Sequence, residues 1–486
     1  MPPLEQPSQF VYSDNGCDNY NQSQSRSQSQ SQSLQVGSVP QSVTSLTFDT
    51  YDIPLQPSTL PSSIKYLTFG VYYNLAIDVG VLPSSLTTLF FGHSFNRSLE
   101  PGALPDSITS IKFGDQFNTE LAEGSLPSSL LHLRFGKKYN MPLNIGVLPD
   151  SITYLHLGRS FEQKLQPRVL PSSLIGLCLS DHYTHNIEPG ILPLSITNLE
   201  FGEFYDHQLE NGALPYSLIN LSLGRLFNHD ILHCSLPVGL KSITFSRDFN
   251  KMIVPGTLPT SITSLVFGLE FNTCLAVGSL HEGLLHLDVG SSPGTLPNSL
   301  TRLCFGVMFN IVLEPGLLPD SIKTLNLGTF FSETLHPDAL PKSLTSLYIE
   351  DRLPVPSDQC PSGLVHLIAT GIPPALPPSI TILDISSHPA DTFRWNKVHN
   401  GSTLKELHLR MDGVLGKDIE RTALGFFKQT IRYYLPNVLE YYFNLYNHYF
   451  HTSTMILRMD GLFHAFQLIK YIEDIHEVTH FKYIDI

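Results

Sequence analysis

One 22-residue stretch decides the fold, and at residues 82–103 it reads LPSSLTTLFFGHSFNRSLEPGA. Its Leu-Pro pair starts at residues 60, 82, 104, 126, 148, 170, 192, 214, 236 and 258, and again at 296, 318 and 340. A shortened unit starts at residue 280, and degenerate units start at Val39, Cys360 and Leu376. Self-similarity at a fixed period is typical of repeat proteins. We therefore expect about 17 units between residues 39 and 385, with one more strand at residues 404–409.

An aromatic residue stands at the fourteenth position of all twelve full-length units from residue 60 onward. The set comprises Tyr73, Phe95, Phe117, Tyr139, Phe161, Tyr183, Tyr205, Phe227, Phe249, Phe271, Phe309 and Phe331. Aromatic residues make up only 10% of the chain, so chance does not explain this column. We expect these rings to fill the core of every unit.

The unit at residues 82–103 predicts one short strand per repeat. Leu89 and Phe91 alternate with Thr88 and Phe90. Side chains of a strand point alternately to its two faces, so the first pair should be buried and the second should face outward. Gly92 then ends the strand at a turn. A unit of this length is too short for a strand plus a long helix, and its core must be completed by its neighbours, which predicts a solenoid.

Two polar columns accompany the apolar ones. A serine follows the Leu-Pro pair, as at Ser85 and Ser107, and we expect its hydroxyl to cap turn amides. An asparagine follows the aromatic residue, as at Asn96 and Asn118, and we expect it to satisfy backbone groups of adjacent coils. Both columns are predicted to be structural.

The block from Leu86 to Asn96 resembles a leucine-rich repeat, and it is most similar to the FNIP repeat family. That family places a Phe-Asn pair after a strand and before an LPxSLTxLxFG block, as at Phe95-Asn96 and Phe117-Asn118. The resemblance implies a leucine-rich-repeat-like solenoid that binds proteins. Some relatives carry an F-box or a kinase ahead of the repeats, and residues 1–38 are too short and too polar for either. The predicted fold class is a mainly-β, right-handed leucine-rich-repeat-like solenoid of about 17 coils with a mixed α/β C-terminal cap.

The two ends of the chain depart from the repeat. Residues 1–38 contain a Gln/Ser tract and are predicted to be a disordered tail. The solenoid is assigned to residues 39–385 and a partly helical capping region to residues 386–486. Apolar spacing over residues 416–446 favours an amphipathic helix that Pro436 interrupts. Two copies of LRMDG, at 409–413 and 457–461, predict strands that end in turns, and a separate signalling module is the alternative to a cap.

Composition and charge exclude several functions. The net charge of −14 argues against a nucleic-acid partner, which requires a basic face. No run of 18 apolar residues and no secretory signal are present, so we expect no membrane insertion and an intracellular, cytoplasmic location. Six cysteines without a CxxC pair predict free thiols and neither a disulfide framework nor a metal site. We expect no cofactor.

The outward-facing seventh and ninth positions of each unit are the candidate binding surface. Over the early coils they combine aromatic and basic residues, of the kinds that dominate interface hot spots. The predicted partner-binding residues are Tyr66, Phe90, Lys112, His132, Arg134, Tyr154 and His156. Our hypothesis is that an acidic protein partner docks here, and random surface variation is the alternative.

No catalytic set stands out in the sequence. His281 and His286 flank a Glu but are five residues apart, which does not fit a zinc-protease helix. The sequence therefore predicts a non-catalytic protein-interaction scaffold. Alternatives are the recognition arm of a signalling or ubiquitin-ligase assembly, acting with a separate module, and a carbohydrate-active β-solenoid enzyme. The enzyme would require clustered carboxylates on neighbouring coils, and the outward columns offer only Glu200 and Asp288.

Overall fold

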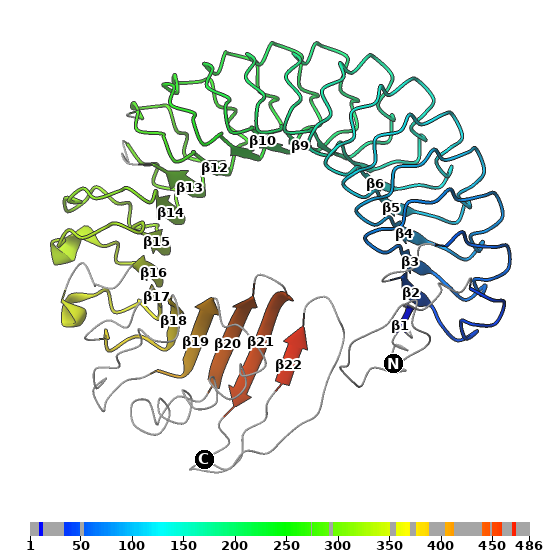
Figure 1. Ribbon diagram of the computed structural model, residues 1–486. Coiled ribbons are helices and arrows are strands. Elements are labelled where there is room, and N and C mark those ends of the chain that lie inside the picture. Colours follow the sequence, from blue (N-terminus) through cyan, green and yellow to red (C-terminus); the bar gives the residue numbers. More distant parts are fainter. Residues whose placement is uncertain are drawn as a thin grey trace. The chain divides into compact units, whose positions relative to one another are not determined.

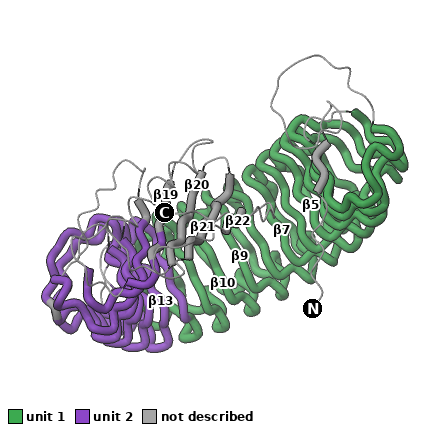
Figure 2. The backbone as a smooth tube through the Cα atoms, turned by 90° about the horizontal axis from the view of Figure 1, so that it is seen from below, with its two compact units in different colours: residues 1–262 green, residues 263–486 purple. Residues whose placement is uncertain are grey.

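A computed structural model gives the fold of two units of the chain, residues 1–262 and 263–486 (Figure 2). It describes residues 9–12, 34–48, 53–273, 275–290, 295–349, 356–369, 376–387, 404–412, 440–447, 450–458 and 469–472. Both units are built from short strands, and in each the strands lie side by side while the rest of every coil loops away from them (Figure 1).

The first unit is a parallel sheet in which every strand pairs with the strand of the next coil. Its strands are β1 (Gln9–Tyr12), β2 (Ser45–Phe48), β3 (Tyr66–Thr68), β4 (Thr88–Phe90), β5 (Ser110–Lys112), β6 (His132–Arg134), β7 (Tyr154–His156), β8 (Gly176–Cys178), β9 (Asn198–Glu200), β10 (Asn220–Ser222) and β11 (Ser242–Thr244).

The second unit continues the same construction and ends in longer strands. It contains β12 (Ser264–Val266), β13 (His286–Val289), β14 (Arg302–Phe305), β15 (Thr324–Asn326), β16 (Ser346–Ile349), β17 (His366–Ala369), β18 (Ile382–Ser387), β19 (Glu406–Asp412), β20 (Glu440–Asn447), β21 (Phe450–Arg458) and β22 (Ile469–Ile472). Two 3-10 turns lie at Pro337–Ala339 and Ser357–Gln359. The pairing is parallel from β12 to β20 and antiparallel from β20 to β22.

The strand alternation predicted for residues 88–91 is confirmed. Leu89 is 0% exposed and Phe91 is 5% exposed, whereas Phe90 is 39% exposed. The fourteenth-position rings lie behind the strands and stack coil upon coil. The Phe117 ring is 3.9 Å from Phe113 in its own coil and 6.0 Å from Phe95 in the preceding one. The fourteenth-position rings stack in this way from Tyr73 to Phe161, so the aromatic column is continuous over these coils.

Both polar columns join neighbouring coils. The asparagines do so as predicted, and the serines bond to a different kind of backbone group from the one predicted. The Asn96 backbone N–H donates to Asn74 Oδ1 at 2.9 Å, and the same bond recurs from Asn118 to Asn96. The serine hydroxyls at Ser85, Ser107 and Ser151 donate to a carbonyl of the preceding coil, where the sequence predicted capping of turn amides. Ser85 Oγ, for example, donates to the Ile64 carbonyl of the preceding coil at 2.7 Å. That carbonyl lies just before β3, so the hydroxyl satisfies a backbone acceptor at the start of the strand.

The glycine after the strand is needed for close stacking. A Cβ on Gly92 would lie 1.7 Å from the Gly70 carbonyl oxygen, and one on Gly114 would lie 1.7 Å from the Gly92 carbonyl oxygen. The turn predicted at Gly92 is confirmed, since the Phe95 N–H donates to the Gly92 carbonyl at 3.3 Å. Neither glycine has a positive φ, so glycine itself is needed for the contact between backbones. Gly102 is different, because its φ of 81° is a left-handed conformation that other residues rarely adopt.

The ends of the chain differ in part from the predictions. Within the expected tail, residues 9–12 form β1 and pair with β2, because Phe10, Val11 and Tyr12 favour strands. Residues 13–33 lie outside the described residues. Most of the helix expected over 416–446 also lies outside them, and its last residues form β20, where Tyr441, Phe443 and Leu445 alternate with period two. Both LRMDG copies begin in a strand, at the ends of β19 and β21, and the turns expected after them lie outside the described residues.

The aromatic column should dominate the stability of the first unit. Phe117→Ala removes a fully buried ring, so we expect the free energy of unfolding of this unit to fall by about 3–5 kcal/mol. Urea unfolding followed by hydrogen exchange of the β4–β6 amides measures it. Tyr216→Ala is the matched control, because Tyr216 is 70% exposed. If the free energy of unfolding falls no further for Phe117→Ala than for Tyr216→Ala, the stacked rings do not form the stabilising core.

Candidate functional site

A groove of about 580 Å³ runs across the outward face of the first unit from β4 to β11. Six of the seven predicted residues line it: Phe90, Lys112, His132, Arg134, Tyr154 and His156. Tyr66 is not among the lining residues, although it lies on β3 opposite Thr88 of β4. The structure therefore brings together most of the predicted surface, and the groove continues beyond it to β11.

The lining residues form two rows because neighbouring strands pair without any shift in register. Lys112 lies opposite Arg134, which lies opposite His156. The same row continues through Cys178 to Glu200. The parallel row, two residues earlier on each strand, contains His132, Tyr154 and Gly176. Glu200 belongs to the outward column by its repeat position, but it was left out of the predicted binding residues because the later coils carry mostly small neutral residues there. The register joins it to the Arg134 row.

The second row is an aromatic shelf. The His132 and Tyr154 rings stack with centroids 5.1 Å apart and planes inclined by 14°. The Tyr154 ring also lies over Gly176, where an added Cβ would be 2.5 Å from Tyr154 Cδ1. A side chain at position 176 would displace this ring, so the glycine keeps it flat against the sheet. Tyr154 remains 47% exposed and therefore presents its ring to a ligand.

The basic groups of the groove have no acidic partner. Within the described residues, neither Lys112 nor Arg134 forms an ion pair within 4 Å. The nearby row at the twelfth unit position is different. Asp115 is 2.9 Å from Lys137, and Asp181 is 3.2 Å from Arg159. The hydrogen bond from Lys137 holds the pKa of Asp115 below its usual range. Lys112 and Arg134 are therefore neighbouring cations in the groove without an ion pair, in contrast to this row.

The centre of the groove is electrically neutral. Burial lowers the pKa of His156, and the Arg134 cation lowers it further, so its imidazole is uncharged at pH 7. His156 Nδ1 accepts a hydrogen bond from the Gly158 backbone N–H at 2.9 Å. Burial raises the pKa of the Cys178 thiol to about 12, and the Glu200 carboxylate adds to this effect. Because nucleophilic reactivity requires the thiolate, Cys178 is inert at neutral pH.

Neither a metal site nor a membrane-spanning helix is found among the described residues. Among the described residues, no three His, Cys, Asp or Glu side chains are grouped so that they could hold a metal ion. The same residues include no helix with the length and apolar character needed to span a bilayer.

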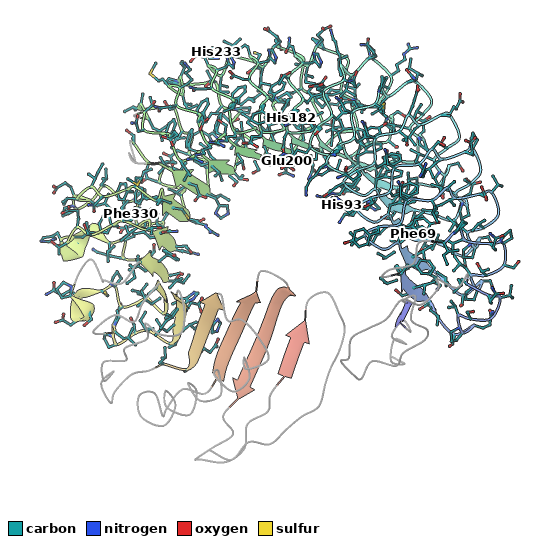
Figure 3. All side chains as sticks on the ribbon, viewed as in Figure 1. Phe69, His93, His182, Glu200, His233 and Phe330 are labelled. Carbon is teal, nitrogen blue, oxygen red and sulfur yellow. The ribbon has the colours of Figure 1, made fainter. Side chains whose placement is uncertain are left out.

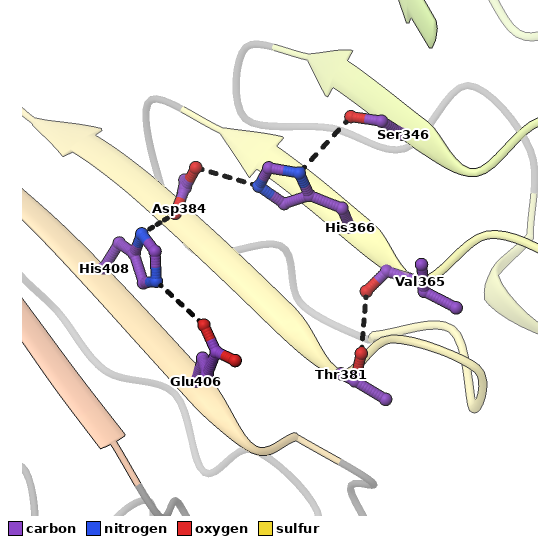
Figure 4. Close-up of polar contacts among 7 residues, drawn as sticks. All are labelled: Ser346, Val365, His366, Thr381, Asp384, Glu406 and His408. Atoms are coloured by element: carbon purple, nitrogen blue, oxygen red, sulfur yellow. Dashed lines mark hydrogen bonds and ion pairs between the residues drawn. The ribbon is translucent and has the colours of Figure 1, made fainter. Parts of the chain in front are cut away.

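The second unit carries a separate polar cluster on β17, β18 and β19 (Figure 4). The Asp384 carboxylate is 2.8 Å from His366 Nε2 and 2.8 Å from His408 Nδ1. His408 Nε2 is 3.3 Å from the Glu406 carboxylate. Burial alone would raise the pKa of Asp384, but hydrogen bonds from both histidines outweigh it and hold that pKa well below its usual range. Burial likewise opposes the charged form of His408, yet Asp384 and Glu406 together raise its pKa. The cluster ties three adjacent strands together.

The parallel coils, their inward-facing leucines and their short strands define the class as leucine-rich-repeat-like solenoids. Among solved structures, the chain is similar to CroV588, a circular leucine-rich-repeat protein, with a TM-score of 0.65 and 31% identity. That alignment covers 79% of this chain and 62% of the other, so the chain spans under two thirds of that protein. The mouse RP105/MD-1 complex matches with a TM-score of 0.52 at 16% identity, covering 77% and 76% of the two chains. No curated protein matches the sequence.

The FNIP Repeat family model matches residues 31–70, 51–94, 95–138, 139–182, 183–226, 227–269, 249–292, 291–330 and 309–352. These matches cover more than half of the sequence, and the chain belongs to the FNIP repeat family. Repeats of this kind are typical of non-catalytic interaction scaffolds.

The polar cluster should make the stability of β17–β19 depend on pH. The stabilisation of β17–β19 by the Asp384 carboxylate is present above about pH 4 and is lost as pH falls through the lowered pKa of Asp384. The His408 contribution is complete below about pH 6.5 and is lost as pH rises through its raised pKa. The opening free energy of these strands, from hydrogen exchange corrected for intrinsic rates, should therefore be greatest between those values.

Asp384→Asn should reduce that opening free energy by on the order of 1–3 kcal/mol and flatten its pH profile. Glu314→Gln removes an exposed carboxylate elsewhere in the second unit and should change neither. A wild-type profile that rises between pH 6 and pH 8, or an Asn variant with an unchanged profile, would show that the cluster does not hold the strands.

Proposed function

We propose that the chain is a non-catalytic scaffold that binds a protein partner in the groove on β4–β11. The observation that carries this proposal is the pair of unpaired cations, Lys112 and Arg134, held in register beside the aromatic shelf of His132 and Tyr154. Exposed Arg and Tyr side chains are the residue types most often responsible for binding energy at interfaces. Two adjacent cations without a counterion favour a partner that presents carboxylates.

The alternatives have less support. A glycoside-cleaving enzyme requires two carboxylates about 5–10 Å apart, whereas Glu200 is the one carboxylate among the residues that line this groove. A nucleic-acid partner does not fit a chain with a net charge of −14 and only two lining cations. One similar structure is the mouse RP105/MD-1 complex, which supports protein binding as a use of this fold.

Free thiols support the intracellular location that the sequence predicted. Among the residues that the structure describes, Cys178, Cys234, Cys304 and Cys360 are all unpaired. Disulfides are rare in reducing compartments, where thiols of this kind persist.

Charge reversal in the groove tests the proposal. Lys112→Glu with Arg134→Glu should abolish capture of the groove-dependent partner from a cell extract, and should weaken binding of the purified partner at least about tenfold. Isothermal titration measures the dissociation constant, and raising the salt concentration should weaken wild-type binding more than variant binding.

The matched control is Lys138→Glu with Lys251→Glu, which reverses the same total charge on the first unit at positions outside the groove. Equal partner recovery by wild type and the groove variant would contradict the proposal. So would equal loss in the groove variant and in the control, because net charge alone would then explain it.

A further inference from the structure

The outward row of the groove carries opposite charges at two places along its length. Lys112 and Arg134 lie on β5 and β6, and Glu200 lies on β9 in the same register row. Figure 3 shows Glu200 beside the strands and His233 on the opposite side of the coils. Adjacent strands are about 4.8 Å apart, so the three strand steps from Arg134 to Glu200 span about 14 Å.

These charges do not neutralise each other. Among the described residues, the Glu200 carboxylate forms no ion pair within 4 Å, and neither does Arg134. The residues between them, His156 and Cys178, are half-buried and carry no charge at neutral pH. The row is therefore a fixed dipole with a neutral centre, and its two poles are both open to a ligand.

The spacing of the two rows favours an extended chain over a helix. The charged row and the aromatic row are two residues apart along each strand, which corresponds to about 7 Å. A helix with side chains is about 10–12 Å across, which is wider than this spacing between the rows. An extended segment fits, and it advances about 3.3 Å per residue, so about four residues separate side chains that reach the two poles.

We infer that the groove takes an extended peptide segment that crosses the strands, with an acidic side chain over Lys112 and Arg134 and a basic side chain over Glu200. About four residues separate the two charges, and an aromatic or apolar side chain between them lies against Tyr154. This inference rests on the proposed function and specifies the partner's chemistry: the recognised element is a short segment of mixed charge, and a uniformly acidic surface does not satisfy Glu200.

Selection from a random 12-residue peptide library displayed on phage tests the inference with the full chain as bait. Wild type should enrich sequences with Asp or Glu about four residues from Lys or Arg, in either chain direction. Glu200→Lys should remove the preference for the basic residue and retain the acidic one. Lys112→Glu with Arg134→Glu should remove the acidic preference and retain the basic one. Lys138→Glu with Lys251→Glu should select the same peptides as wild type.

A synthetic peptide enriched on wild type should bind Glu200→Lys at least about tenfold more weakly, by fluorescence anisotropy. Thermal unfolding of each variant verifies that these exposed substitutions leave the fold intact. If enrichment depends on Lys112 and Arg134 but does not change in Glu200→Lys, the ligand does not need a basic side chain. That result would overturn the inference but would not contradict the proposed function. Enriched peptides that no groove substitution affects would contradict both. Failure to enrich any peptide would overturn the inference of a short linear ligand, while partner capture would still test the scaffold.

Discussion

Unshifted pairing of coils is the constraint on which the rest of the structure depends. Each unit returns the chain to the same point of the next coil, so Leu89 pairs with Ile111 and Ile111 with Leu133. Strands of three residues cannot correct a slip by themselves. The register is held by contacts that recur every 22 residues, such as the Gly92 carbonyl against Gly114 and the hydrogen bond from Asn118 to Asn96. The shortened unit keeps it, since His286 pairs directly with Arg302.

Because the register is unshifted, residues at the same repeat position form rows across the sheet, and two of these rows line the groove. At the twelfth position opposite charges stand on neighbouring coils and pair, as Asp115 does with Lys137. At the ninth position Lys112 and Arg134 are neighbours of like charge, and the nearest acid in the row, Glu200, is three strands further on. Like charges at adjacent strand positions repel each other, so this arrangement lowers the stability of the ligand-free chain. Binding of a ligand with the opposite charge removes this repulsion.

The fold was predictable because the same local pattern occurs in every repeat. Leu89 and Phe91, for example, could be assigned to the core from their spacing alone. The site was predictable in part. Outward positions follow from strand period, which found Arg134 and Tyr154. The strand period does not show where the surface is hollowed. Tyr66 was therefore included although it does not line the groove, and Glu200, which does line it, was left out. Beyond the repeat, helix-like spacing over residues 416–446 was ambiguous, and the aromatic alternation of β20 was the stronger local signal.

The central claim is that ligands bind the strand-face groove and not another surface of the first unit. Site-specific photocrosslinking tests it most directly, with benzoylphenylalanine placed at position 154 or at position 216 and a peptide enriched on the wild-type chain as ligand. Both native tyrosines are exposed, at 47% and 70%, so both positions can reach solvent. The account predicts crosslinks from position 154 that the unlabelled peptide competes away, and none from position 216. Equal crosslinking from both positions, or crosslinking from position 216 alone, would contradict it.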